Sequence, residues 1–268
     1  MTARIIAVAN QKGGVGKTTT AVNLAASLSA TRRRVLLVDL DAQGNATMGV
    51  GVDKNSIAKT ARDLLLEKAK PDEVIRELPQ LGFHLIPANG DMTEAEVRLR
   101  EMPVGDFALK SVLAEISDRF DFIIIDCPPA LSKLTVNALV AADGVLVPMQ
   151  CEYYALEGLT ALVDTINRIR KLINPKLEIE GLLRTMFDPR NNLANEVSAQ
   201  LTQHFGDKVY RTIVPRNVRL AEAPSHGLPA LFYDAQSPGA RAYIALAGEM
   251  LRRHDGGQLR MEHRAEGA

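Results

Sequence analysis

The sequence predicts an α/β protein with a single doubly wound, mostly parallel sheet flanked by helices. Short aliphatic runs alternate with helix-length amphipathic segments, a pattern typical of βαβ units. Several of these runs are apolar throughout, as expected for strands that helices cover on both faces. No internal repeat or linker divides the chain, so we expect one large domain.

The expected elements follow from this alternation. We expect strands at residues 4–9, 34–38, 83–86, 122–125, 145–147, 179–185 and 209–214. Helices are expected to begin near Lys17, Thr60, Asp72, Thr93, Gly105, Leu134, Leu156, Asn192 and Gly239. The domain is expected to span residues 1–254, and residues 255–268 are expected to form a flexible C-terminal tail.

Composition limits the classes of function. Lys plus Arg (32) equals Asp plus Glu (32), so no whole-protein basic field attracts nucleic acid, and any DNA contact needs a local patch. The two cysteines, Cys127 and Cys151, are too few for a disulfide framework and indicate a reducing compartment. The sequence has no signal-peptide pattern and no apolar run long enough to span a membrane, so we expect a cytoplasmic protein.

The loop after the first expected strand has the residues of a phosphate-binding site. Its glycines let backbone N–H groups surround phosphate oxygens, and the following helix N-terminus adds positive potential. Lys17 is expected to neutralise phosphate charge and Thr18 to ligate Mg²⁺. The expected nucleotide-binding residues of this loop are Gly13, Gly14, Val15, Gly16, Lys17, Thr18 and Thr19. Gln11 stands where the strict phosphate-loop pattern has glycine, so the loop is a variant.

Residues 12–19 resemble the deviant Walker A motif of the ParA/MinD class of P-loop ATPases. Lys12 is the hallmark of that motif. The resemblance implies that Lys12 reaches across a nucleotide-sandwich homodimer to the partner's phosphates, so that hydrolysis depends on dimerisation in the ATP state. It assigns catalytic roles to Lys12 and Lys17.

Two carboxylates, Asp39 and Asp41, end the second expected strand. Ligand sites in α/β sheets form at the carboxyl ends of strands. The segment resembles switch I of the same class, with Ala42 in place of the usual proline, and this resemblance implies that Asp41 positions the hydrolytic water and contacts Mg²⁺ through water. Asp39 either acts directly or caps the strand end, and we favour Asp41 for catalysis.

The strand at residues 122–125 leads into Asp126, the Walker B arrangement, so Asp126 is expected to hold Mg²⁺ through water. The adjacent Cys127 admits two alternatives, a nucleophile or an iron–sulfur ligand. Neither is favoured, because no activating histidine is adjacent and Cys151 lies in a different context. We interpret both cysteines as small buried side chains.

The base is expected to be adenine, because the Asn-Lys-x-Asp stretch with which related GTPases recognise guanine does not occur. Residues 213–225 resemble the loop that packs against adenine in ParA proteins, which implies base contacts from Pro215 and Asn217. The resemblance extends to about Arg253 and indicates the short chromosomal ParA, or Soj, branch. ATP and Mg²⁺ are therefore the expected cofactors.

Basic side chains outnumber acidic ones between residues 184 and 219, a local excess in a neutral chain. By the resemblance, Arg190 and Arg219 bind double-stranded DNA without sequence preference, through phosphate contacts. It also implies a ParB-type centromere-binding partner, association with the nucleoid and a role in segregating chromosome or plasmid DNA.

Two alternatives remain open. A MinD-like ATPase would cycle on a membrane through a C-terminal amphipathic helix, but residues 251–264 contain a glycine pair and few large apolar side chains. We therefore expect no membrane partner. A nucleotide-switched regulatory module with little hydrolysis is the second alternative, and the intact Lys12, Asp41 and Asp126 argue against it.

Overall fold

The computed structural model describes the backbone of residues 2–265 and the side chains of residues 2–254. Within this part of the chain, one sheet has the strand order β3-β4-β2-β5-β1-β6-β7-β8. Neighbouring strands are parallel except for the antiparallel pair β3 and β4. The strands are β1 (Arg4–Val8), β2 (Val35–Asp39), β3 (Arg76–Leu78), β4 (Phe83–Ile86), β5 (Phe122–Asp126), β6 (Gly144–Met149), β7 (Glu178–Phe187) and β8 (Val209–Pro215).

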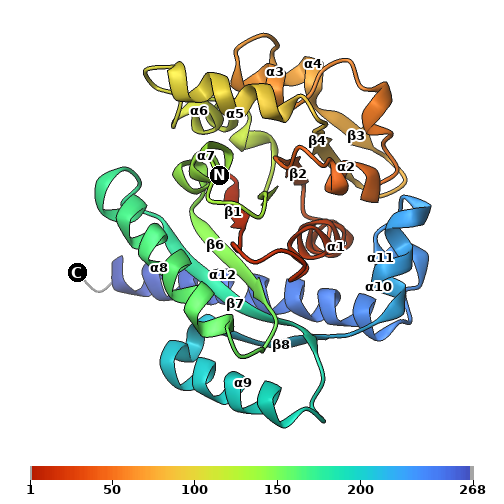
Figure 1. The fold of residues 1–268 in the computed structure, drawn as a ribbon, viewed down its shortest axis with the longest axis vertical. Helices are drawn as coiled ribbons and strands as arrows, with labels where there is room; N and C mark the ends of the chain where they lie inside the picture. The colour runs from red at the N-terminus through yellow and green to blue at the C-terminus, as the bar shows by residue number, and fades with distance from the viewer. Residues whose placement is uncertain (1, 266–268) are drawn as a thin grey trace.

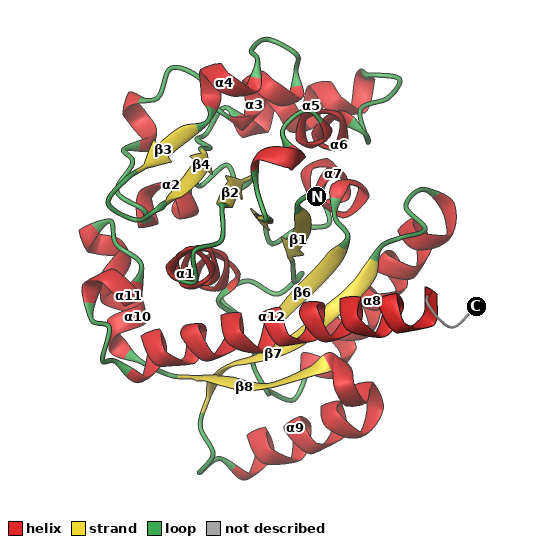
Figure 2. Cartoon of the chain, turned by 180° about the vertical axis from the view of Figure 1, so that it is seen from behind, coloured by secondary structure: helices red, strands yellow, loops and turns green. Residues whose placement is uncertain are grey.

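Helices cover both faces of this sheet (Figure 1). Helices α1 and α12 pack with one face, and α5 to α9 pack with the other, which gives the two large hydrophobic cores; a third, small cluster lies at Ala223, Ala230 and Ala240. Figure 2 shows α12 crossing β6 and β7 on the side opposite to α8. The helices are α1 (Lys17–Ala30), α2 (Asn45–Gly49), α3 (Ala61–Leu65), α4 (Pro71–Val74), α5 (Met92–Glu101), α6 (Ala108–Ala114), α7 (Lys133–Ala141), α8 (Ala155–Leu172), α9 (Asn192–Phe205), α10 (Val218–Glu222), α11 (Ala230–Tyr233) and α12 (Pro238–Ala265).

The doubly wound, mostly parallel sheet that the sequence predicts is confirmed. Strands β2, β5 and β6 are buried along their whole length, which explains why they read as continuous apolar runs. The predicted helix start near Gly105 was wrong by three residues, because residues 102–107 form successive turns before α6 begins at Ala108. Strand β3 was missed because only one of its three residues is buried.

The central strands end at one level. Asp126 at the end of β5 lies in register with Val8 of β1 on one side and with Asp39 of β2 on the other. The loop that leads into α1 follows β1 directly. The architecture therefore brings the phosphate-loop segment and the strand-end carboxylates to a single edge of the sheet.

The chain continues as helix to Ala265, past the start of the tail expected at residue 255. Side chains from residue 255 onward and the whole of residues 266–268 lie outside the described residues, so a flexible tail stays a prediction. Over the part that is described, no helix combines the length and apolar character needed to cross a bilayer.

A buried polar network anchors α12 to the sheet. Glu180 of β7, which is 6 % exposed, accepts hydrogen bonds from Arg4 at 3.2 Å and from the Tyr210 hydroxyl at 3.1 Å. His254 Nε2, near the end of the described part of α12, lies 3.2 Å from the same carboxylate. Burial raises the pKa of Glu180, but the contacts with His254 and Arg4 outweigh it and lower the pKa to about 2.

This network predicts an acid-dependent loss of stability. A carboxyl with a lower pKa in the folded state stabilises the protein above its unfolded value of about 4.3, and this contribution falls as pH drops from there toward 2. By pH 3 the wild-type protein should have lost about 2 kcal/mol of unfolding free energy that Glu180→Gln does not lose, as measured by urea unfolding at several pH values. The exposed control Glu157→Gln should follow the wild type, and equal losses in Glu180→Gln and wild type would contradict the prediction.

Candidate active site

The phosphate-loop segment joins β1 to α1 through left-handed glycines. Gly14 has φ +74° and Gly16 has φ +86°, a region that side chains with a Cβ rarely adopt. A Cβ placed on Gly13 or Gly14 would meet no atom within 4 Å, so the loop leaves open space in front of its backbone. Gly16 is also the N-cap of the 14-residue helix α1. This geometry can hold an anion against backbone N–H groups and a helix N-terminus.

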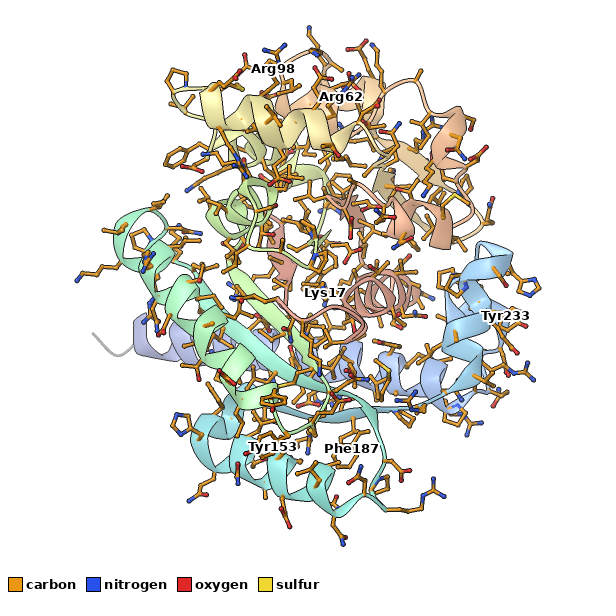
Figure 3. All side chains as sticks on the ribbon, in the orientation of Figure 1. Lys17, Arg62, Arg98, Tyr153, Phe187 and Tyr233 are labelled. Carbon is orange, nitrogen blue, oxygen red and sulfur yellow. The ribbon has the colours of Figure 1, made fainter. Side chains whose placement is uncertain are left out.

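Lys17 begins α1 and lies near the centre of the molecule (Figure 3). Its side chain is 7 % exposed, and Nζ donates a hydrogen bond to the Lys12 carbonyl at 3.0 Å. Burial lowers the pKa of Lys17, while the nearby Asp126 and Asp41 act in the opposite direction. A positive charge is thus held inside the loop, next to two carboxylates.

Asp126 is fully buried, and neither of its carboxylate oxygens has a hydrogen-bond partner among the described residues. Burial, followed by the charge of Asp39, raises the pKa of Asp126 well above its usual value, and Thr18 and Lys17 oppose this shift. A buried carboxylate without donors suits a cation. A divalent cation here would find oxygen ligands from Asp126, Thr18 and Asp41, which is the chemistry that Mg²⁺ prefers.

The described side chains contain no group of three or more His, Cys, Asp and Glu residues arranged to enclose a metal. Mg²⁺ does not need such a cage, because it keeps several waters and is usually bound by one or two carboxylates together with substrate phosphates. The residues present therefore fit Mg²⁺ held with a nucleotide.

Asp39 and Asp41 differ in their surroundings. Asp39 is fully buried and accepts hydrogen bonds from the backbone of Asp41 at 3.0 Å and from Thr47. Burial raises the pKa of Asp39 to about 6, although the hydrogen bonds from Thr47 oppose the shift. Asp41 is half-buried and accepts a hydrogen bond from the backbone of Gln43. Of the two, Asp41 is the carboxylate accessible to a water molecule.

A cavity of about 390 Å³ opens beside the loop. Pro215 and Asn217, the two expected base contacts, line it together with Gly16 and Thr19. The Oδ1 atom of Asn217 is buried and has no hydrogen-bond partner among the described side chains and backbone. A planar base could enter this cavity and pack beside Pro215 and Asn217.

Sequence reasoning missed three residues of this cavity, Thr185, Met186 and Tyr243. Thr185 donates a hydrogen bond to the Val15 carbonyl of the loop at 2.8 Å, and Met186 has a left-handed backbone with φ +49°. The signal that could have found Thr185 and Met186 is their position at the carboxyl end of a parallel strand. No sequence pattern pointed to Tyr243, which comes from α12.

Lys12 does not contact its own loop through its ammonium group. Its Nζ lies 2.5 Å from the carboxylate of Glu152, and the two side chains are 43 % and 52 % exposed. Tyr153, labelled in Figure 3, and Tyr154 follow Glu152 and are 74 % and 69 % exposed. The predicted trans-acting lysine thus stands on an open surface with a large aromatic area next to it.

The two expected DNA-binding arginines are both exposed. Arg190 follows β7 and pairs with Asp188, and Arg219 in α10 pairs with Glu222 and with Asp234. Arg184 adds nothing to a basic surface, because its guanidinium donates inward to Ser198 and to backbone carbonyls.

Both cysteines are buried free thiols, which confirms their interpretation as small buried side chains. Burial raises the pKa of Cys127 far above its usual value and that of Cys151 to about 11. Neither is poised to act as a thiolate.

Comparisons with known proteins show which family the chain belongs to. A family model described as an AAA domain matches residues 3–179. An uncharacterized protein of Pseudomonas putida is 62% identical over 94% of this chain and 95% of its own length. The chromosome partitioning protein ParA of Myxococcus xanthus is 48% identical, covering 93% of this chain and 88% of its own, and the sporulation initiation inhibitor protein Soj of Bacillus subtilis is 48% identical, covering 92% and 98%.

Among solved structures, cobyrinic acid a,c-diamide synthase from Mycobacterium smegmatis with a bound ATP analog and magnesium superposes with a TM-score of 0.84 at 36% identity, over 95% of this chain and 97% of that one. On the strength of the sequence matches along more than nine-tenths of its length, the chain belongs to the ParA/Soj family of chromosome-partitioning ATPases.

Proposed function

We propose that this ATPase dimerises around MgATP, binds DNA without sequence preference in that state, and segregates chromosome or plasmid DNA with a ParB-type partner on the nucleoid. The observation that carries the proposal is that the Lys12 ammonium pairs with Glu152 on an exposed surface and does not contact its own loop. Its role can be tested separately from that of the buried Lys17.

The nucleotide part of the proposal rests on three adjoining features. The left-handed loop and Lys17 suit the phosphates, Thr18 and the unpartnered Asp126 suit Mg²⁺, and the cavity at Asn217 suits the base. The bound ATP analog and magnesium of the Mycobacterium smegmatis relative support the same cofactors here.

The hydrolytic part assigns the attacking water to Asp41. Its carboxylate is half-buried at the sheet edge, close enough to Lys17 to act on the charge of that group. When bound, Mg²⁺ supplies charge neutralisation for the phosphates. Asp126 and Thr18 orient that ion, and Lys17 holds the phosphate charge inside the loop.

The dimer part follows from electrostatics. An ion pair as exposed as Lys12 with Glu152 contributes about 0–1 kcal/mol, so Lys12 can exchange this partner at little cost. A second copy facing the first would offer the phosphates of its own nucleotide, which carry more negative charge than one carboxylate. Lys12 would then complete the partner's site.

The DNA part follows from the same reasoning. Arg190 and Arg219 are held by exposed carboxylates whose interactions are weak, so DNA phosphates can replace them. Because the chain has no net charge, one subunit offers few phosphate contacts. Two subunits side by side would double the number, and this couples DNA binding to the ATP dimer.

Substitution of Lys17 and substitution of Lys12 should impair different steps of the ATPase cycle. Lys17→Ala should weaken ATP binding by about tenfold or more, because a buried charge-assisted hydrogen bond contributes about 1.5–3 kcal/mol. Lys12→Ala should keep its ATP affinity within about threefold and lose ATP-dependent dimerisation and hydrolysis. Nucleotide titration, light scattering and phosphate release measure the three effects.

The exposed Lys59, which pairs with Glu73 away from the loop, provides the matched control. Lys59→Ala should behave as the wild type in all three measurements. An ATP-dependent dimer of Lys12→Ala with normal turnover would remove the trans-acting role of this lysine.

DNA binding should depend on charge and not on sequence. Each arginine removed deletes two phosphate contacts from a dimer, so Arg190→Ala and Arg219→Ala should each reduce the slope of log affinity against log salt by up to about two. The measurement is a salt series on two unrelated duplexes with ATP, made on variants that still dimerise.

Arg98→Ala is the control for this series, because Arg98 is also exposed and paired with a carboxylate but lies in α5, at the far end of the molecule (Figure 3). Its slope should match the wild type. Unchanged slopes for both Arg190→Ala and Arg219→Ala would place the DNA surface elsewhere, and a strong preference for one duplex would refute binding through phosphates alone.

A further inference from the structure

We propose that Asp39 is a positioning residue for ATP hydrolysis, which acts by fixing the loop that presents Asp41. It does so without touching the nucleotide or the metal. The inference rests on the proposed water-positioning role of Asp41 and adds the residue that makes that role possible.

The carboxylate of Asp39 joins the two ends of the loop. One oxygen accepts a hydrogen bond from the backbone N–H of Asp41 at 3.0 Å. The other accepts from the backbone N–H of Thr47 at 2.9 Å and from the Thr47 hydroxyl at 2.8 Å. A single buried side chain therefore spans the segment from residue 41 to residue 47.

Thr47 also connects this segment to the residues that follow β4. Its hydroxyl oxygen accepts a hydrogen bond from the backbone N–H of Ala88, just after β4, at 2.9 Å. Gly44 comes so close to the same segment that a Cβ there would lie 2.7 Å from the Ala88 carbonyl oxygen. The loop is thus fixed against the protein at Asp39, at Thr47 and at Ala88.

A comparison with Asp126 separates the roles of the two buried carboxylates. Both are fully buried, and they lie in register on neighbouring strands. Within the described part of the chain, neither oxygen of Asp126 accepts a hydrogen bond, whereas both oxygens of Asp39 accept hydrogen bonds from the segment that follows it, at Asp41 and Thr47. The Asp126 carboxylate is therefore available to bind a cation, whereas the Asp39 carboxylate is already hydrogen-bonded to its own chain segment.

The catalytic consequence follows from geometry. A group that orients an attacking water must be held within a fraction of an ångström, and a displacement of about 1 Å can cost about a hundredfold in rate. Asp39→Asn keeps the size of the side chain but replaces one acceptor oxygen with an NH₂ group. That group would face an N–H of Asp41 or Thr47, so one end of the loop would lose its acceptor.

The test compares steady-state hydrolysis and nucleotide binding in matched variants. Asp39→Asn should lower kcat by about 10- to 100-fold, with KM for ATP, nucleotide affinity and ATP-dependent dimerisation near wild-type values. Thr47→Val removes only the bridging hydroxyl and should lower kcat less, and Thr47→Ser should restore it.

Asp143→Asn is the matched control. The Asp143 carboxylate also accepts a hydrogen bond from a backbone N–H, that of Ile5 at 2.9 Å, but at the opposite edge of the sheet. This variant should keep the wild-type kcat even where its melting temperature falls. If Asp39 has only a structural role, Asp39→Asn should likewise show lower thermal stability and unchanged kcat. That result would overturn the inference.

Asp41→Asn in the same series separates the inference from the proposed function. Loss of turnover in Asp41→Asn with normal kcat in Asp39→Asn contradicts only the inference, whereas normal turnover in Asp41→Asn contradicts the assignment of Asp41 itself. A large rise in KM for ATP in Asp39→Asn would show direct nucleotide or metal contact and overturn the positioning role. If Asp39→Asn does not fold, equal kcat values for Thr47→Val and wild type overturn it.

Discussion

The arrangement of the whole site depends on the burial of two carboxylates in register at the carboxyl edge of a parallel sheet. Asp39 and Asp126 sit on neighbouring strands with no exposed surface, where uncompensated negative charge is costly. The backbone of its own loop satisfies Asp39. Asp126 accepts no hydrogen bond from the described residues, and the nearby Thr18 and Lys17 side chains offset its negative charge only in part. A divalent cation bound with phosphates would offset the rest.

Much of the fold and of this edge could be predicted from local sequence. Parallel strands covered on both faces must be apolar along their length, and a polar residue directly after such a run lies at the carboxyl edge. Asp41 and Asp126 were expected at this edge on these grounds and Lys17 from the glycine loop before α1, and the structure brings the three together there. Strand β3 and the short helices α2, α10 and α11 lack this signal, since three to five residues cannot show a period.

Contacts between distant segments could not be predicted. The bond from Thr185 to Val15 spans 170 residues, and the pair of Lys12 with Glu152 spans 140, so neither follows from spacing. The inward orientation of Arg184 also depends on α9 and β8 packing beside β7, whereas composition counted this residue toward a basic patch. The sequence therefore indicated which residue types could bind phosphate or metal, whereas the contacts between distant residues became known only from the fold.

One chain supplies most of the proposed nucleotide site, but the Lys12 ammonium pairs with the exposed Glu152, which the exposed Tyr153 and Tyr154 follow in the chain. The central claim is that a second chain makes use of this surface when ATP is bound. Size-exclusion chromatography with light scattering, run with Mg²⁺ and either ADP or ATP, tests it most directly. We predict the monomer mass with ADP and twice that mass with ATP, and the same mass with both nucleotides would contradict the account.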